Sequence, residues 1–348
     1  MNNLIKPKPL QTGDVVAAVS LSAGLAGTIP YRYEIGKKQL EEEFSIKLIE
    51  MPHTLKDITS VKNNPKERAA DLMAAFSDPE IKAIFTCIGG EDSIRILPYI
   101  DFEVIRSNPK IFLGYSDTTV THMICLKAGL TSFYGPAILS NFAENQGILS
   151  FTAEQIRKAI FSTIPVGKVH GSPVWTAAHL DWFEPENQKI KRPLLSAPDR
   201  KLLQGQGIVK GRLIGGCVQT LITIVGTELW PNAESWNSAI IFLDISESEL
   251  PLNIFRYFLR NIGTQGILQS INAIILGRPG GQRSIDECEA YENELINIIA
   301  LEFGRPDLPI LSRMDFGHTD PMMTLPYGVL AELNCSDLSF SIKESGVE

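Results

Sequence analysis

Short apolar runs alternate with amphipathic segments along the first half of the chain. The runs at residues 15–19, 82–88 and 111–113 are nearly continuous in apolar residues, which is typical of strands buried on both faces. Between them, residues 33–44 and 65–76 place apolar side chains at helical spacing. Strands that alternate with helices predict an α/β fold, with a parallel sheet covered by helices on both faces.

The second half of the chain has strands of its own, and an irregular stretch separates the two halves. Apolar runs at residues 240–243, 273–276 and 309–311 predict further strands, and 329–342 reads as a closing hairpin. Around residues 165–206 the pattern fades into a segment with Pro, Gly, Lys and two tryptophans. A loop of this length is usually functional or disordered, and its aromatic residues favour function. We therefore expect an N-terminal domain over 1–165, a connector with an active-site loop over 166–206, and a C-terminal domain over 207–348.

Composition narrows the classes of ligand. The 348 residues are 44% hydrophobic and carry a net charge of −8, which argues against nucleic acid and acidic membranes and favours a small ligand. The five cysteines are scattered and odd in number, so neither disulfides nor a structural zinc site is expected, and a reduced, cytoplasmic setting follows. We find neither a signal-peptide core nor an apolar run of bilayer length. No metalloprotease or P-loop motif is present, so no metal is predicted.

One serine stands where a nucleophile is expected. Residues 111–113 end in Gly114-Tyr115-Ser116-Asp117, and a run with helical spacing follows. Strand, tight turn and helix are the context in which a serine projects from the end of a sheet as a nucleophile. Thr118 stands where the full elbow motif has its second glycine. Ser116 and Asp117 equally suit the capping of the next helix, so the local pattern leaves both interpretations open.

A base and an acid are available at other predicted strand ends. His318 follows the strand at 309–311 in a Gly-His-Thr-Asp-Pro loop, whereas His122 lies inside the helix after Ser116, too far round to face it. Asp244 and Glu247 follow the strand at 240–243 and are the candidates for an acid that orients the imidazole. The chain order serine, acid, histidine is one of those known for catalytic triads.

The run Gly89-Gly90-Glu91-Asp92-Ser93 has three interpretations. Its glycines can offer backbone N–H groups to an oxyanion. The same run can cradle a phosphate in a small-molecule kinase. It can also be a plain tight turn, since glycine pairs are common after strands.

Several blocks of the sequence together resemble the LD-carboxypeptidase family of serine peptidases, which includes muramoyl-tetrapeptide carboxypeptidases and microcin C self-immunity proteins. The blocks follow the family's order along nearly the whole chain. They are Gly13-Asp14 with the following strand and residues 89–101, 114–117, 211–216, 241–244 and 316–318.

The resemblance implies a Rossmann-like N-terminal domain, a smaller β-rich α/β C-terminal domain, and a Ser–His–acid triad across the cleft between them. Ser116 matches the nucleophile and His318 the base. The oxyanion donors would be the backbone N–H groups of Gly90 and Asp117. The family's acid is usually glutamate, and the matching position is Asp244, one methylene shorter. We favour Asp244 and keep Glu247 as the alternative.

The resemblance also bears on substrate and partners. The chain length and the loop with Trp175 and Trp182 are more similar to the microcin-immunity branch, in which such a loop contacts the nucleotide end of the substrate. Gly89 and Glu91 are further candidate substrate contacts, and Arg212 is a candidate for binding a substrate carboxylate. The resemblance implies that the protein needs no cofactor. It also implies that the protein forms a homodimer.

The expected function is hydrolysis of an amide in an L,D-muropeptide or in a peptidyl- or aminoacyl-nucleotide. The alternatives are a kinase that uses residues 89–93 and a two-domain protein that binds a ligand without turnover.

Overall fold

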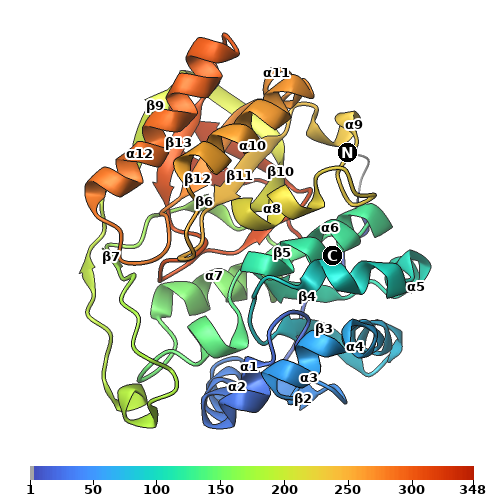
Figure 1. The fold of residues 1–348 in the computed structure, drawn as a ribbon. Helices are drawn as coiled ribbons and strands as arrows, with labels where there is room; N and C mark the ends of the chain where they lie inside the picture. The colour runs from blue at the N-terminus through green and yellow to red at the C-terminus, as the bar shows by residue number, and fades with distance from the viewer. Residues whose placement is uncertain (1–3) are drawn as a thin grey trace.

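Two β-sheets organise the chain, and each carries its own helices (Figure 1). The computed structural model describes residues 4–348. The first sheet has six strands in the order β14-β5-β4-β3-β1-β2, of which only β14 runs antiparallel to its neighbour. Its strands are β1 Val15–Val19, β2 Lys47–Glu50, β3 Ile81–Thr86, β4 Ile111–Gly114, β5 Phe133–Tyr134 and β14 Leu325–Pro326.

The helices of the first half connect these parallel strands, which confirms the predicted parallel sheet with helices. The central strands are apolar and buried because helices cover both of their faces. The α-helices are α1 Leu25–Thr28, α2 Pro30–Phe44, α3 Ile58–Asn63, α4 Pro65–Ser77, α5 Phe102–Ser107, α6 Thr119–Ala128 and α7 Ser150–Ile160. The other helical segments are η1 Ser93–Tyr99, η2 Ser116–Thr118 and η3 Ile138–Phe142.

The second sheet has eight strands in the order β6-β16-β15-β10-β11-β12-β13-β9. Strands β10 to β13 are parallel, and antiparallel strands flank them on both sides. The strands are β6 Gly167–Val169, β9 Lys201–Gln204, β10 Ile208–Cys217, β11 Ile240–Asp244, β12 Ala273–Gly277, β13 Ile310–Met314, β15 Leu330–Asn334 and β16 Ser339–Ile342. The helices are α8 Val218–Ile224, α9 Ala233–Trp236, α10 Leu252–Thr264, α11 Ile267–Ser270, α12 Ile285–Ile296 and η5 Asn297–Glu302.

The connector is less regular than either half. Figure 1 shows it as an extended yellow-green stretch along one side of the molecule, reaching from the second sheet toward the first half. It contains the two-stranded sheet of β7 Val174–Trp175 and β8 Leu195–Ser196, and the short helix η4 Pro185–Lys189. Its ends, β6 and β9, are edge strands of the second sheet, while β14 from the C-terminal segment joins the first sheet. The first sheet therefore includes a strand from the C-terminal segment, and the second sheet includes two strands from the connector.

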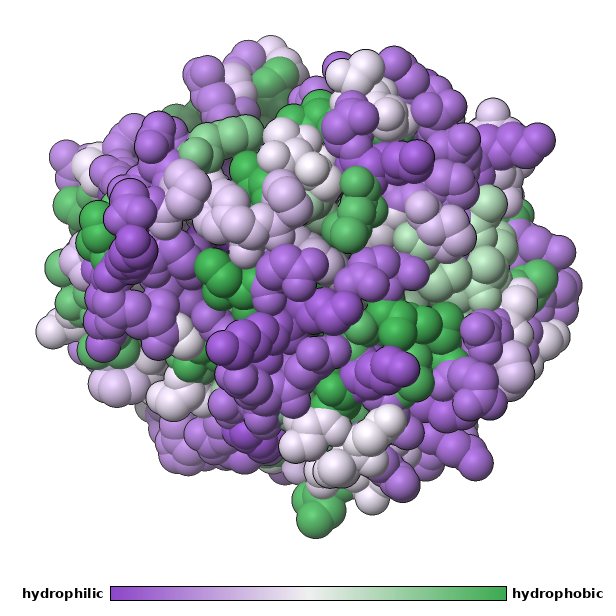
Figure 2. Space-filling model, turned by 90° about the horizontal axis from the view of Figure 1, so that it is seen from below, coloured by the Kyte–Doolittle hydropathy of each residue, from purple (hydrophilic) through white to green (hydrophobic). Residues whose placement is uncertain are grey.

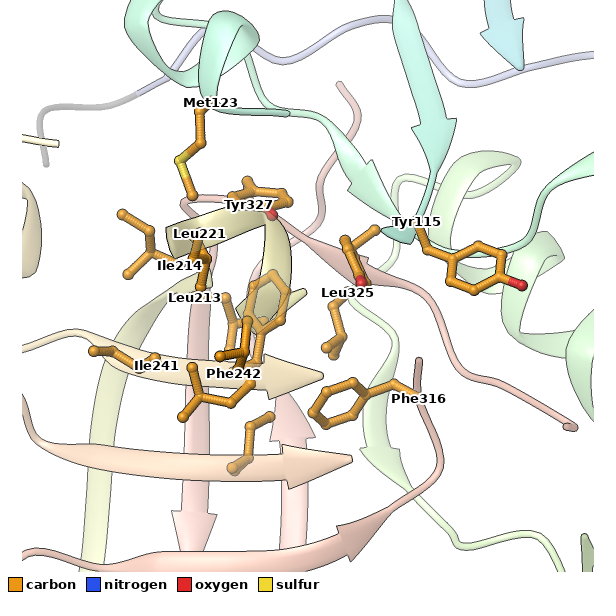
Figure 3. Packing of buried hydrophobic residues seen from close by; sticks show 14 of the residues in the cluster. Tyr115, Met123, Leu213, Ile214, Leu221, Ile241, Phe242, Phe316, Leu325 and Tyr327 are labelled. Carbon is orange, nitrogen blue, oxygen red and sulfur yellow. The ribbon is translucent and has the colours of Figure 1, made fainter. Parts of the chain in front are cut away.

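A continuous apolar core joins the two halves behind the ends of β4 and β11. Figure 3 shows Phe242 of β11 near Phe316 and Tyr327, with Met123 and Tyr115 of the first half of the chain on either side of this group. The ring of Phe242 lies 5.1 Å from that of Tyr327 and 5.3 Å from that of Tyr134, centroid to centroid. Because protein interiors are close-packed, this core fixes the two strand ends relative to each other.

Figure 2 shows that hydrophilic residues dominate the face seen from below, interrupted by small apolar patches. Within residues 4–348, no helix combines the length and the apolar character needed to cross a membrane.

Candidate active site

Ser116 stands on a constrained turn between β4 and α6. Its φ of 66° lies in the left-handed region, which non-glycine residues rarely adopt. Its backbone N–H donates to the Tyr134 hydroxyl at 3.2 Å, and its carbonyl accepts from Thr119 Oγ1 at 2.7 Å. The capping positions of η2 and α6 are Tyr115 and Thr118, and neither makes a side-chain cap bond. The hydroxyl of Ser116 is therefore not used to begin the helix.

Gly89 lies directly against the serine. A Cβ at this position would sit 2.7 Å from Ser116 Cβ, 2.9 Å from Ser116 Oγ and 3.3 Å from the backbone nitrogen of Asp117. Only glycine fits beside the serine without displacing it. Gly90 follows with a φ of 147° and lines the same pocket as Ser116. The glycine pair of the sequence is thus placed next to the serine turn.

Asp92 and Ser93, the last two residues of the Gly-Gly-Glu-Asp-Ser run, make contacts that stabilise the backbone around the serine turn. The buried carboxylate of Asp117 accepts from Ser22 Oγ at 2.5 Å and from the Ser93 backbone at 2.8 Å. Ser93 Oγ in turn donates to the Asp117 carbonyl at 2.7 Å. Asp92 pairs with the buried guanidinium of Arg68 at 2.8 Å. These contacts use the polar groups of the run to hold the backbone in place.

His318 and Asp244 form a buried pair at the ends of the second-half strands. Nδ1 of His318 lies 2.7 Å from Oδ2 of Asp244, and the His318 backbone N–H donates to Oδ1 at 3.2 Å. Tyr134 donates its hydroxyl proton to Oδ2 at 2.6 Å. Asp244 has no exposed side-chain surface, so these donors replace water around its charge.

The loop that carries His318 passes unusually close to this carboxylate. Gly317 has a φ of 89°, and a Cβ there would lie 1.9 Å from Oδ1 of Asp244. The close approach lets an aspartate reach the imidazole although its side chain is one methylene shorter than that of glutamate.

The surroundings of His318 favour its charged form. Burial lowers its pKa, but the charge and hydrogen bonding of Asp244, with smaller contributions from Glu247 and Asp320, outweigh burial and raise the pKa above its ordinary value. His122 behaves in the opposite way. It is fully buried, its ring nitrogens lie 2.9 Å from the Gly114 carbonyl and from Ser132 Oγ, and burial lowers its pKa to about 3.

The structure places the two candidate acids at different nitrogens of the imidazole. Asp244 lies at Nδ1, whereas Oε2 of Glu247 lies 3.6 Å from Nε2. The Glu247 side chain is 66% exposed, in contrast to the buried Asp244. The two carboxylates therefore have different surroundings and face different ring atoms.

A pocket of about 460 Å³ collects these residues. Ser116, Gly89, Gly90, Glu247 and His318 line one part of it, and residues 176–183 of the connector, which include His179 and Trp182, line another. The residues that line it thus come from both halves of the chain and from the connector.

Three residues expected to contact substrate do not line this pocket. Glu91 lies beyond Gly90, and Trp175 packs with the guanidinium of Arg278 5.6 Å from its ring centre. Arg212 pairs with Glu344 at 2.9 Å and donates to the Gly328 carbonyl, so these contacts direct its side chain away from the pocket.

Two arginines that were not predicted as site residues from the sequence, Arg32 and Arg192, fix the connector beside the pocket. Arg192 pairs with Asp320 at 2.7 Å and with the buried carboxylate of Glu144. The guanidinium of Arg32 lies 4.2 Å over the Trp182 ring, and burial lowers the pKa of Arg32 to about 10. Their partners are far apart in sequence, so no local motif signals these contacts.

In residues 4–348, no group of three or more His, Cys, Asp or Glu side chains is placed to hold a metal ion. The functional groups available for catalysis around the pocket are a serine hydroxyl, a histidine imidazole and carboxylates.

Comparison with known proteins identifies this two-part α/β chain as a serine peptidase. The chain belongs to the LD-carboxypeptidase family, because residues 16–135 match the family's N-terminal domain and residues 210–333 its C-terminal domain. Family membership confirms both the predicted resemblance and the predicted enzyme class.

Relatives agree with this assignment. The chain is 31% identical to the microcin C7 self-immunity protein MccF of Escherichia coli, over 97% of this chain and 95% of that protein. It is 25% identical to the murein tetrapeptide carboxypeptidase of Pseudomonas aeruginosa, over 77% of each. The crystal structure of an MccF-like protein from Streptococcus pneumoniae in complex with AMP superposes with a TM-score of 0.86, at 28% identity over 96% of this chain and 99% of that one.

Proposed function

We propose that this protein is a serine hydrolase that cleaves an amide bond, with Ser116 as nucleophile, His318 as base and Asp244 as the orienting acid. The observation that carries the proposal is the 2.7 Å contact between the buried Asp244 and Nδ1 of His318, because His318 lines the same pocket as Ser116 on its constrained turn. Because Asp244 occupies Nδ1, it leaves Nε2 to accept the serine proton. Glu247 faces Nε2 and cannot serve as the orienting acid from there.

The reaction follows from these positions. His318 takes the proton of Ser116 as Oγ bonds to the carbonyl carbon of the substrate, and the backbone N–H groups of Gly90 and Asp117 stabilise the oxyanion that forms. The C–N bond then breaks, and the departing nitrogen takes the proton from His318. Water, deprotonated by His318, attacks the acyl-enzyme and releases the acid and free Ser116. Asp244 and Tyr134 keep the imidazole in one orientation throughout.

We further propose that the leaving group is a nucleotide or a close analogue. Trp182 and His179 line the connector side of the pocket, where an aromatic ring can stack on a base. Solved relatives support this choice: one is described in complex with AMP, and MccF in complex with aspartyl sulfamoyl adenosine, at TM-scores of 0.86 and 0.84. An L,D-muropeptide is the second candidate, favoured by the similarity to murein tetrapeptide carboxypeptidase.

Turnover of two substrates tests the proposal. An aminoacyl sulfamoyl adenosine and an L,D-tetrapeptide muropeptide are incubated with the wild type and with Ser116→Ala, with and without MgATP. We expect hydrolysis of the first substrate by the wild type, no ATP dependence, and almost complete loss in Ser116→Ala. Preferential cleavage of the muropeptide would overturn the choice of leaving group. Binding without turnover, or phosphoryl transfer that survives Ser116→Ala, would overturn the hydrolase.

A further inference from the structure

Glu247 brings a carboxylate to the catalytic end of the pocket, where no Lys or Arg side chain of residues 4–348 forms an ion pair with it. Within the described part of the chain, His318 is the only basic side chain within 4.0 Å of its carboxylate. The other acidic groups nearby are compensated. Asp320 is paired with Arg192, and Asp244 is enclosed by Tyr134 and His318. Asp181 also lines the pocket, on the connector side, so Glu247 is the carboxylate without a Lys or Arg partner at the catalytic end.

The backbone on both sides of Glu247 is anchored. Arg283 donates to the carbonyls of Ser246, at 3.0 Å, and Ser248, at 3.1 Å, and also to that of Gly280. The Gln219 side chain donates to Ser246 Oγ at 2.7 Å. The guanidinium of Arg283 is therefore engaged with carbonyl groups, and the Glu247 carboxylate is held near the imidazole without being paired to this cation.

The Glu247 carboxylate lies close to where the acyl part of the substrate would bind. Nε2 of His318 exchanges its proton with the serine and the departing nitrogen in the proposed reaction, and Oε2 of Glu247 lies 3.6 Å from that atom. A group bound by Glu247 is therefore close to the scissile carbonyl. A carboxylate in this setting binds an ammonium group through a charge-assisted hydrogen bond, and it repels a second carboxylate.

We propose that Glu247 forms an ammonium subsite, which binds a primary ammonium group on the residue that supplies the acyl part of the substrate. The inference rests on the proposed hydrolase function. The ammonium can be the α-amino group of that residue or the end of a cationic side chain, and the chemistry of recognition is the same for both.

Three substrates that share one leaving group separate these sources: N-acetylalanyl, alanyl and lysyl sulfamoyl adenosine. They are compared by kcat/KM in the wild type, in Glu247→Gln and in the control Glu249→Gln, which removes an exposed carboxylate two residues away that does not line the pocket. A charge-assisted hydrogen bond predicts a preference of about tenfold for the substrate that carries the bound ammonium. We expect Glu247→Gln to reduce this ratio to about one to two, and Glu249→Gln to leave it unchanged.

The kcat/KM ratio that falls in Glu247→Gln identifies which ammonium group the subsite binds. A fall in alanyl over N-acetylalanyl assigns the subsite to the α-ammonium, and a fall in lysyl over alanyl assigns it to a side-chain ammonium. A charge-reversed variant, Glu247→Lys, should instead favour a glutamyl over a glutaminyl substrate. Turnover with the same ratios in wild type and Glu247→Gln overturns the subsite alone. Absence of turnover of every substrate by the folded wild type overturns the hydrolase, and the subsite with it.

Discussion

The strand ends that carry Ser116, Asp244 and His318 differ sharply from the connector that faces them across the pocket. Asp244 and His318 have side chains that are 0% and 5% exposed, and several backbone and hydroxyl groups fix them. On the connector, Phe183 and Leu195 are 57% exposed, and regular structure is sparse. Side chains on packed strand ends are held more precisely than side chains on loops, which change more readily.

The comparison suggests a division of labour. We assign the chemistry to the groups held by the core behind β4 and β11. The connector is joined to the second sheet through β6 and β9, side chains such as Arg32 and Arg192 hold its middle part, and we assign it the recognition of the leaving group. Changes at the strand ends should therefore reduce kcat, and changes in the connector should act on the choice of substrate.

The largest effect after loss of the serine itself is expected for Asp244→Asn. An amide in place of the carboxylate favours the wrong tautomer of His318 and removes the charge that stabilises the imidazolium, so kcat should fall about 10³- to 10⁴-fold. Glu247→Gln is the matched control, and it should cost about tenfold at most. Single-turnover kinetics of both variants check this. A loss of kcat in Glu247→Gln that exceeds the loss in Asp244→Asn would show that Asp244 is wrongly assigned as the acid.

Gly89→Ala should have the next largest effect. The new methyl group would lie 2.7 Å from Ser116 Cβ, so the serine turn has to shift. A displacement of the nucleophile on this scale costs about 100-fold in kcat. Gly171→Ala is a control for the substitution itself, since the backbone there is not left-handed and a Cβ would have its nearest neighbour at 3.4 Å, an ordinary contact distance. Both variants are checked for kcat and for thermal unfolding. Undiminished kcat in Gly89→Ala would mean that the serine turn is not as constrained as described.

Trp182→Ala tests the connector. If the indole stacks on the base, kcat/KM for a nucleotide substrate should fall about tenfold, mostly through KM. Trp175→Ala removes the same ring from a connector position that does not line the pocket, and it should have little effect on KM. Equal losses in the two variants would argue for a general loosening of the connector instead of stacking.

The smallest expected effect is on the pH profile. His318 acts as a base only when it is neutral, so kcat/KM should rise with pH through its pKa. Asp244 raises that pKa most and Glu247 raises it less, hence the acidic limb should lie above the ordinary histidine value. Glu247→Gln should move the limb to lower pH. A profile measured on a substrate without an ammonium group checks this, and a shift to higher pH would contradict it.

Much of the site follows from the sequence because its members stand directly after strands. Ser116, His318 and the two candidate acids Asp244 and Glu247 are predicted on that ground, since parallel strands bring such positions to one edge of a sheet, whereas the preference for Asp244 rests on the family resemblance. The fold class was predicted correctly for the same reason, since buried strands and amphipathic helices leave a periodic signal.

What escaped prediction depends on side chains that meet only in three dimensions. Tyr134 links the amide of Ser116 to Asp244, yet in sequence it is one aromatic residue in a short strand. Arg192 meets Glu144 and Asp320 from more than 45 positions away in each direction. Arg212 was expected at the substrate, but the direction of its side chain on β10 is set by Glu344, which no local pattern reveals.

The most direct test of the account is covalent labelling with a fluorophosphonate, followed by intact mass and peptide mapping. We predict one adduct per chain on the wild type, located at Ser116, no adduct on Ser116→Ala, and much slower labelling of Asp244→Asn. A folded wild type that remains unlabelled, or an adduct on another residue, would contradict the assignment of Ser116 as the nucleophile.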